Sequence, residues 1–157
     1  MPDSSPRPIP TIFVGGLIVG VLDLAYAMVV YSPHHPLLIP RHIATGVLGP
    51  AAYNGGVPAI VLGVVLHFVI ALGAATVFFL ATRYSPLPLR RFLLDRAIVS
   101  GMIFGACVYV VMHYIVLPLS AVPHLHPTPT IYKVTEFIEH WFVVGIPISL
   151  SVRHYSR

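Results

Sequence analysis

The chain has 157 residues, of which 57% are apolar and 9% charged, and a formal net charge of +4. Its mean hydropathy is +0.87, whereas in soluble domains about a quarter of the residues are charged. These values exclude an ordinary soluble domain and indicate one integral membrane domain. The arginines stand at the ends of apolar stretches, where membrane topology explains them, so nucleic-acid binding is not expected.

The N-terminal part predicts a short tail and a first transmembrane helix. Residues 1–10 hold four prolines and no periodic apolar pattern, so we expect a disordered cytoplasmic tail before a single domain of residues 11–157. Residues 11–31 are apolar apart from Asp23 and long enough to span about 30 Å of hydrocarbon. Gly16 and Gly20 share a helix face with Asp23, so this aspartate should point inward.

A second transmembrane helix is predicted at residues 58–82. The preceding residues, 32–57, are rich in proline and glycine, and we expect them to form a loop outside the hydrocarbon. Within this loop residues 43–53 could form a short helix at the membrane interface, which Gly46, Gly49 and Pro50 disfavour. The helix contains one ionisable side chain, His67. Gly63 lies one turn before His67 and should leave space beside it.

A proline-broken turn separates this helix from a third one, predicted at residues 95–119. The turn is expected to contact anionic lipid headgroups through Arg83, Arg90 and Arg91. In the third helix Gly101, Gly105, Tyr109 and His113 follow at steps of four, so a face of small residues leads to a histidine. The single cysteine, Cys107, is interpreted as a small core residue.

The fourth apolar stretch, residues 132–153, follows an outer loop that contains His124 and His126. It carries Glu136, Glu139 and His140 within a segment long enough to cross a bilayer. Ionisable side chains at membrane depth are rare and usually mark a function. Glu136 and His140 are four residues apart and therefore share one helix face, with Glu139 beside them.

The distribution of basic residues predicts the topology. With four spans, seven of the nine lysines and arginines lie on the side of the two termini and two lie on the other side. The positive-inside rule then places both termini in the cytoplasm of a bacterial inner membrane protein. The predicted fold is an all-α antiparallel bundle of four transmembrane helices.

Five ionisable residues are expected to converge in the outer half of this bundle, about 8 to 15 Å below the outer helix ends. They are Asp23, His67, His113, Glu136 and His140. One hypothesis is a transition-metal site or a non-covalent haem, because imidazole is the commonest protein metal ligand and Gly63 and Gly105 would leave room for the ring. A second hypothesis is a proton or small-solute path in a homo-oligomer or with a membrane partner. A third is a purely structural polar network. No catalytic motif is present, so an enzyme is not predicted.

The chain also resembles the YagU-like family of bacterial inner-membrane proteins over about residues 60–154. The resemblance rests on the order and spacing of short motifs: Gly63-Val64, His67-Phe68, Pro86, Met112-His113, Pro118-Leu119, Glu136, His140-Trp141 and Arg153. It implies an inner-membrane location and a helical bundle, and it implies no particular reaction. The shared ionisable positions are His67, His113, Glu136 and His140.

Overall fold

The computed structural model describes residues 8–123 and 130–156, and every regular element in these ranges is helical. The elements are α1 (Pro8–Val30), α2 (Leu38–Leu48), η1 (Gly49–Asn54), α3 (Gly56–Tyr84), α4 (Leu87–Asp95), α5 (Ala97–Val111), η2 (Met112–Val116), α6 (Leu117–Leu119), α7 (Thr130–Glu139), η3 (His140–Gly145) and α8 (Ile146–Tyr155). η1 is a 3-10 helix, whereas η2 and η3 are π-helical turns inside longer helices.

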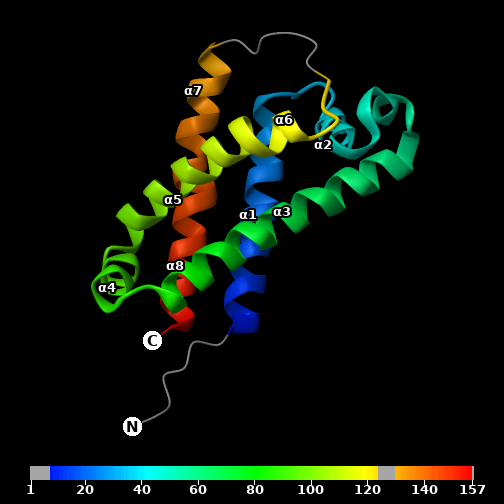
Figure 1. Ribbon diagram of the computed structural model, residues 1–157. Coiled ribbons are helices and arrows are strands. Elements are labelled where there is room, and N and C mark those ends of the chain that lie inside the picture. Colours follow the sequence, from blue (N-terminus) through cyan, green and yellow to red (C-terminus); the bar gives the residue numbers. More distant parts are fainter. Residues whose placement is uncertain (1–7, 124–129, 157) are drawn as a thin grey trace.

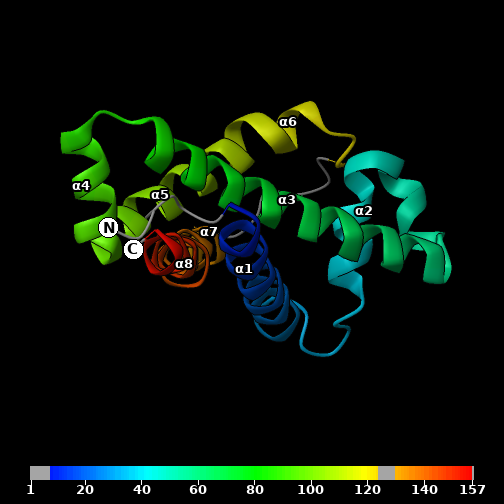
Figure 2. The ribbon, with the colours of Figure 1, turned by 90° about the horizontal axis from the view of Figure 1, so that it is seen from below.

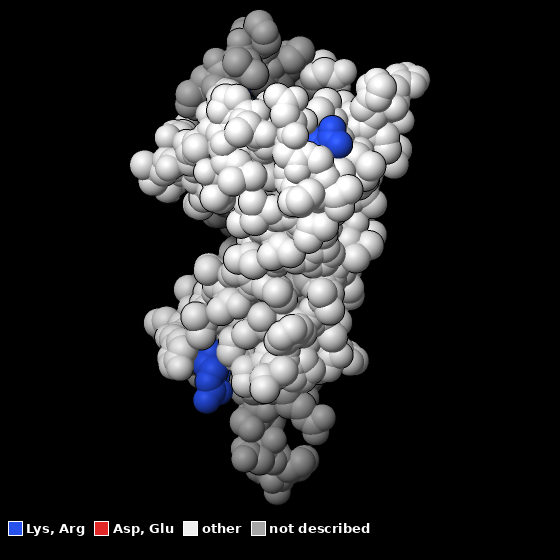
Figure 3. Space-filling model, turned by 90° about the vertical axis from the view of Figure 1, so that its right-hand side faces the viewer, with Lys and Arg blue, Asp and Glu red and all other residues white. Residues whose placement is uncertain are grey.

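Within the described ranges, three helices are long and apolar enough to cross a membrane: α1, α3 and Ala97–Leu119. Their outward side chains are apolar, and Val21, Val61 and Ile103 are each more than half exposed. In one space-filling view, uncharged atoms cover most of the face between two small basic patches (Figure 3). The chain is therefore a multi-pass membrane protein, and this part of the sequence prediction is confirmed.

The helices lie in two orientations (Figures 1 and 2). α1 and the segment from α7 to α8 are steep in Figure 1, whereas α3 and the segment from α5 to α6 are inclined. The start of α1, α4 and the end of α8 lie together at what we call the terminal end; α2 and α6 lie at the opposite, loop end. Successive long segments therefore alternate in direction.

The largest differences from the sequence prediction lie in residues 32–57 and at the start of α1. Residues 32–57 are not an open loop, because they contain α2 and η1. Ala44 and Ala52 are fully buried against Ala59 of α3, and this packing outweighs the poor helix propensity of the glycines. α1 begins at Pro8, three residues earlier than expected, whereas residues 1–7, His124 and His126 lie outside the described ranges.

Glycines bring helix backbones into direct contact at the centre of the fold. A Cβ atom on Gly105 of α5 would meet the carbonyl oxygen of His140, and one on Gly145 would meet the carbonyl oxygen of Gly101. Ser149 of α8 adds a hydrogen bond of 2.6 Å from its Oγ to the carbonyl oxygen of Ala97. The segment of α5 therefore packs against η3 and α8 as closely as two helices can.

Close packing at glycines also joins α1 to α3 and α2 to α3. The space beside Gly20 of α1 is filled by the ring of Phe68, and the space beside Gly63 of α3 is filled by the backbone of Pro40. Between α1, α3, η3 and α8 lies an apolar core made of Val19, Ala71, Ala75, Phe78, Phe79, Val144, Ile148 and Val152. This core occupies the middle of the molecule and extends toward the terminal end.

Replacing Gly105 by alanine tests the backbone contact between α5 and η3. We expect Gly105→Ala to destabilise the fold by about 1–3 kcal/mol, because the added methyl group overlaps the His140 carbonyl. Gly73→Ala is the matched control, since no atom lies within 4 Å of a Cβ at that position. The control should be neutral or stabilising by up to about 1 kcal/mol. Thermal unfolding in detergent measures both, and equal stability of the two variants would contradict the contact.

Candidate functional site

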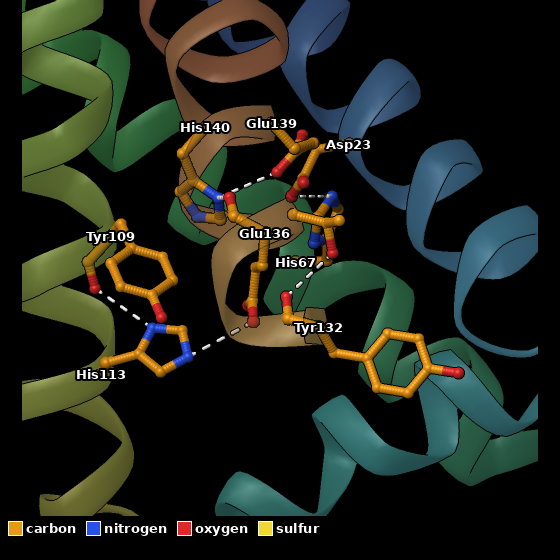
Figure 4. Close-up of polar contacts among 9 residues, drawn as sticks. Asp23, His67, Tyr109, His113, Tyr132, Glu136, Glu139 and His140 are labelled. Carbon is orange, nitrogen blue, oxygen red and sulfur yellow. Dashed lines mark hydrogen bonds and ion pairs between the residues drawn. The ribbon is translucent and has the colours of Figure 1, made fainter. Parts of the chain in front are cut away.

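Ionisable side chains from four helical segments meet in the middle of the molecule as three close pairs (Figure 4). The pairs are His67 Nε2 with Asp23 Oδ2 at 3.7 Å, His113 Nε2 with Glu136 Oε2 at 3.4 Å, and His140 Nδ1 with Glu139 Oε2 at 2.8 Å. Each pair combines one imidazole with one carboxyl group. The structure thus places all five predicted residues, together with Glu139, in one region.

Two of the pairs are joined into one cluster by their carboxyl groups. The carboxyl groups of Asp23 and Glu139 lie side by side, next to His140 (Figure 4). Glu139 is the most buried of these acids, with 2% of its side chain exposed, and its Oε1 atom has no hydrogen-bond donor among the described residues. A carboxylate only accepts hydrogen bonds, so a bond between the two acids requires one shared proton.

Backbone carbonyl groups orient the three histidine rings. The Nδ1 atom of His113 donates to the carbonyl oxygen of Tyr109 at 3.2 Å, and that of His140 donates to the carbonyl oxygen of Glu136 at 2.8 Å. His67 Nε2 donates to the carbonyl oxygen of Gly20 at 3.0 Å, across the interface between α3 and α1. These bonds assign one N–H to each ring. In His113 the other nitrogen faces the acid, whereas in His67 and His140 the same nitrogen faces both the carbonyl group and the acid.

Prolines explain the local backbone at two of these histidines. Pro118 and Pro147 follow η2 and η3, and a proline lacks an N–H group and excludes the carbonyl four residues earlier. The helix widens there: the N–H of Leu117 bonds to the carbonyl of Met112, and that of Ile146 to the carbonyl of Trp141. Such π-helical turns occur often at functional sites.

Tyr109 is a site residue that the sequence analysis did not assign. Its ring stacks on His113 at 4.0 Å and meets His140 edge-on at 5.5 Å. The signal was its spacing of four residues before His113, which puts both on one helix face. Tyr109 therefore separates the two histidines.

A cavity of about 180 Å³ connects this cluster to the loop end. Asp23, His67 and His140 line its inner part, whereas His42 of α2 and Ser120 line the part near the loops. His42 Nδ1 forms a hydrogen bond of 2.7 Å with the Tyr53 hydroxyl group. Toward the terminal end the cavity stops at the apolar core.

The space expected for a haem ring is occupied. Gly63 and Gly105 were predicted to make room for it, but the backbone of Pro40 fills the first position and the backbone of His140 and Trp141 fills the second. These glycines serve close helix packing instead. Among residues 8–123 and 130–156, no group of three or more His, Cys, Asp or Glu side chains is arranged to hold a metal ion.

Neither a scan against protein-family models nor searches of curated proteins and of solved structures found a match to this chain.

The stability lost when a histidine is removed should increase with the burial of its partner carboxyl group. His140→Ala leaves the Glu139 carboxyl group buried without its donor, and we expect a loss of about 3 kcal/mol in the free energy of unfolding. His113→Ala is the comparison, because Glu136 is 30% exposed and can be solvated; about 1 kcal/mol is expected. Unfolding in a denaturing detergent measures both, and an equal loss would contradict the difference in burial.

Proposed function

We propose that the protein is a proton-coupled carrier of the bacterial inner membrane, with its proton site in the His/carboxylate cluster. The observation that supports this most is the order of the contacts. His140, Glu139, Asp23 and His67 follow one another as imidazole, acid, acid and imidazole. Alternating groups of this kind pass protons in membrane pumps and transporters.

The bonding of the His113 ring supports proton exchange. His113 donates from Nδ1 to a carbonyl group, so its Nε2 atom is available to exchange a proton with the Glu136 carboxyl group, which lies 3.4 Å away. A hydrogen bond between the Asp23 and Glu139 carboxyl groups would likewise need one proton. A small change in the surroundings moves such protons from one group to its neighbour.

The closed terminal end supports a carrier in preference to an open pore. The cavity reaches Asp23 and His67 from the loop end, and Val19, Ala71 and Val144 of the apolar core lie at its inner limit. Protons would enter from the loop end and leave only after the core rearranges. A short chain with such a site is expected to act as a homo-oligomer or with a membrane partner.

The orientation that we propose follows from charge. Residues 130–155 would form the fourth span, although Lys133, Glu136 and Glu139 make it the most polar of the long segments. The terminal end carries Arg83, Arg90, Arg91, Arg96 and Arg153, and it would face the cytoplasm with its arginines on anionic lipids. This location agrees with the resemblance to the YagU-like family. A metal ion at His67, His113, Glu136, His140 and Asp23 is the alternative that the first experiment also examines.

The proton path is tested in vesicles loaded with a pH-sensitive dye, with the membrane potential held at zero. An imposed pH gradient should collapse several-fold faster with the protein than without it. Asp23→Asn and Glu139→Gln should abolish this difference, whereas Asp95→Asn, at the end of α4, should leave it unchanged. A flux that is the same in all four proteins would refute the path, and metal bound in elemental analysis of the purified protein would favour the alternative.

The orientation is tested by fusing a reporter enzyme that is active only outside the cytoplasm to Arg157. We expect no activity, because the arginines retain the terminal end in the cytoplasm. The same reporter placed after Tyr53, at the loop end, should be active. Activity at Arg157 would show that the topology is inverted.

A further inference from the structure

A second cavity lies between α3 and the segment of α5 and η2. It has a volume of about 310 Å³, and its lining is apolar, including Val77, Phe104, Cys107 and Val111. Val77, Val111 and Cys107 are exposed, so this cavity opens on the surface that faces lipid. We call it the lateral groove. Cys107 is therefore not the core residue that its apolar neighbours indicated.

The lateral groove adjoins the cavity above the ionisable cluster. The two share five lining residues: Ile70, Ala74, Val108, Met112 and Val116. The shared wall therefore has the lateral groove on one side and, on the other, the cavity that Asp23, His67 and His140 line. Met112 begins the π-helical turn η2, and its unbranched side chain adopts several rotamers at little cost. A molecule dissolved in the bilayer could therefore reach the ionisable cluster through this shared wall.

The polar groups that line the inner part of the cavity can accept hydrogen bonds from a ligand. Asp23 presents a carboxyl group that is 25% exposed. His67 and His140 each use one N–H on a backbone carbonyl, so the second nitrogen of each neutral ring accepts a hydrogen bond. A ligand that fits this end must therefore donate hydrogen bonds, and a positive charge on it would match the acids Asp23 and Glu139.

We propose that the site binds an amphiphilic amine from the membrane, with its alkyl chain in the lateral groove and its ammonium group at Asp23. The apolar groove selects the chain, and the carboxyl group selects the charged, hydrogen-bond-donating head. Fatty acids are repelled by the two acids, and alcohols lack the charge. Only the coupling between amine binding and proton movement rests on the proposed function. In that coupling the ammonium group and a proton compete for the same carboxyl oxygens.

Decylamine is the probe, and calorimetry on the protein in lipid nanodiscs is the measurement. We expect saturable binding of decylamine, weakened about tenfold or more in Asp23→Asn, because a charge-assisted hydrogen bond is lost. Decanoate and decanol, of the same chain length, should partition into protein-containing and empty nanodiscs alike. Equal heats for the three compounds, or unchanged affinity in Asp23→Asn, would overturn the inference.

The single cysteine provides a test that needs no change at the cluster. N-ethylmaleimide should alkylate Cys107 in nanodiscs, bound decylamine should slow the reaction, and the alkylated protein should lose decylamine binding about tenfold or more because the groove is filled. In Cys107→Ser, treatment with the reagent should leave the affinity for decylamine equal to that of the same variant without treatment. Full binding of decylamine after alkylation of Cys107 would show that the groove is not the site.

The two proposals can fail separately. Binding of decylamine without proton flux would remove the carrier function and leave the amine site. Proton flux without decylamine binding would leave the proton path and remove the amine site.

Discussion

Direct contact between helix backbones at glycines is the constraint on which the site depends. Gly105 lets the backbone of α5 touch that of η3 beside His140, and Gly20 lets α1 lie against Phe68 of α3, next to His67. Imidazole and carboxyl side chains are short, so they meet across helices only where backbones approach closely. In lipid, where burial of apolar surface gives no advantage, such contact also supplies much of the attraction between helices.

The sequence predicted the membrane class and the presence of inward-facing ionisable residues because both follow from composition and helical period. The spacing from Asp23 to Gly20 and from His140 to Glu136 already put each residue on a definite face. The partners across helices did not follow, because pairing depends on the tilt of α3 and α5. Glu139 therefore remained a neighbour of the site in the sequence, whereas in the structure it is the acid that joins Asp23 to His140.

Two features could not be read from apolar periodicity. α2 exists because Ala44 and Ala52 find a complementary surface on α3, and a local propensity for loops is overridden by that tertiary packing. The π-helical turns have a visible signal, Pro118 and Pro147, but a proline can also kink or end a helix. Only the surrounding contacts, including the rings of Tyr109 and His113, decide between these outcomes.

The two π-helical turns also bear on how this protein can change through evolution. Each turn holds one residue more than an α-helix needs over the same rise, so a single codon deletion within residues 112–116 or 140–145 would remove it. Residues on the two sides of the turn would keep their helix faces, because the extra residue is taken up inside the turn. Pro118 or Pro147 would then lie inside a narrower helix, where its ring clashes with the carbonyl group four residues earlier. The membrane span would survive such a deletion, whereas the widened turn beside the histidine would be lost.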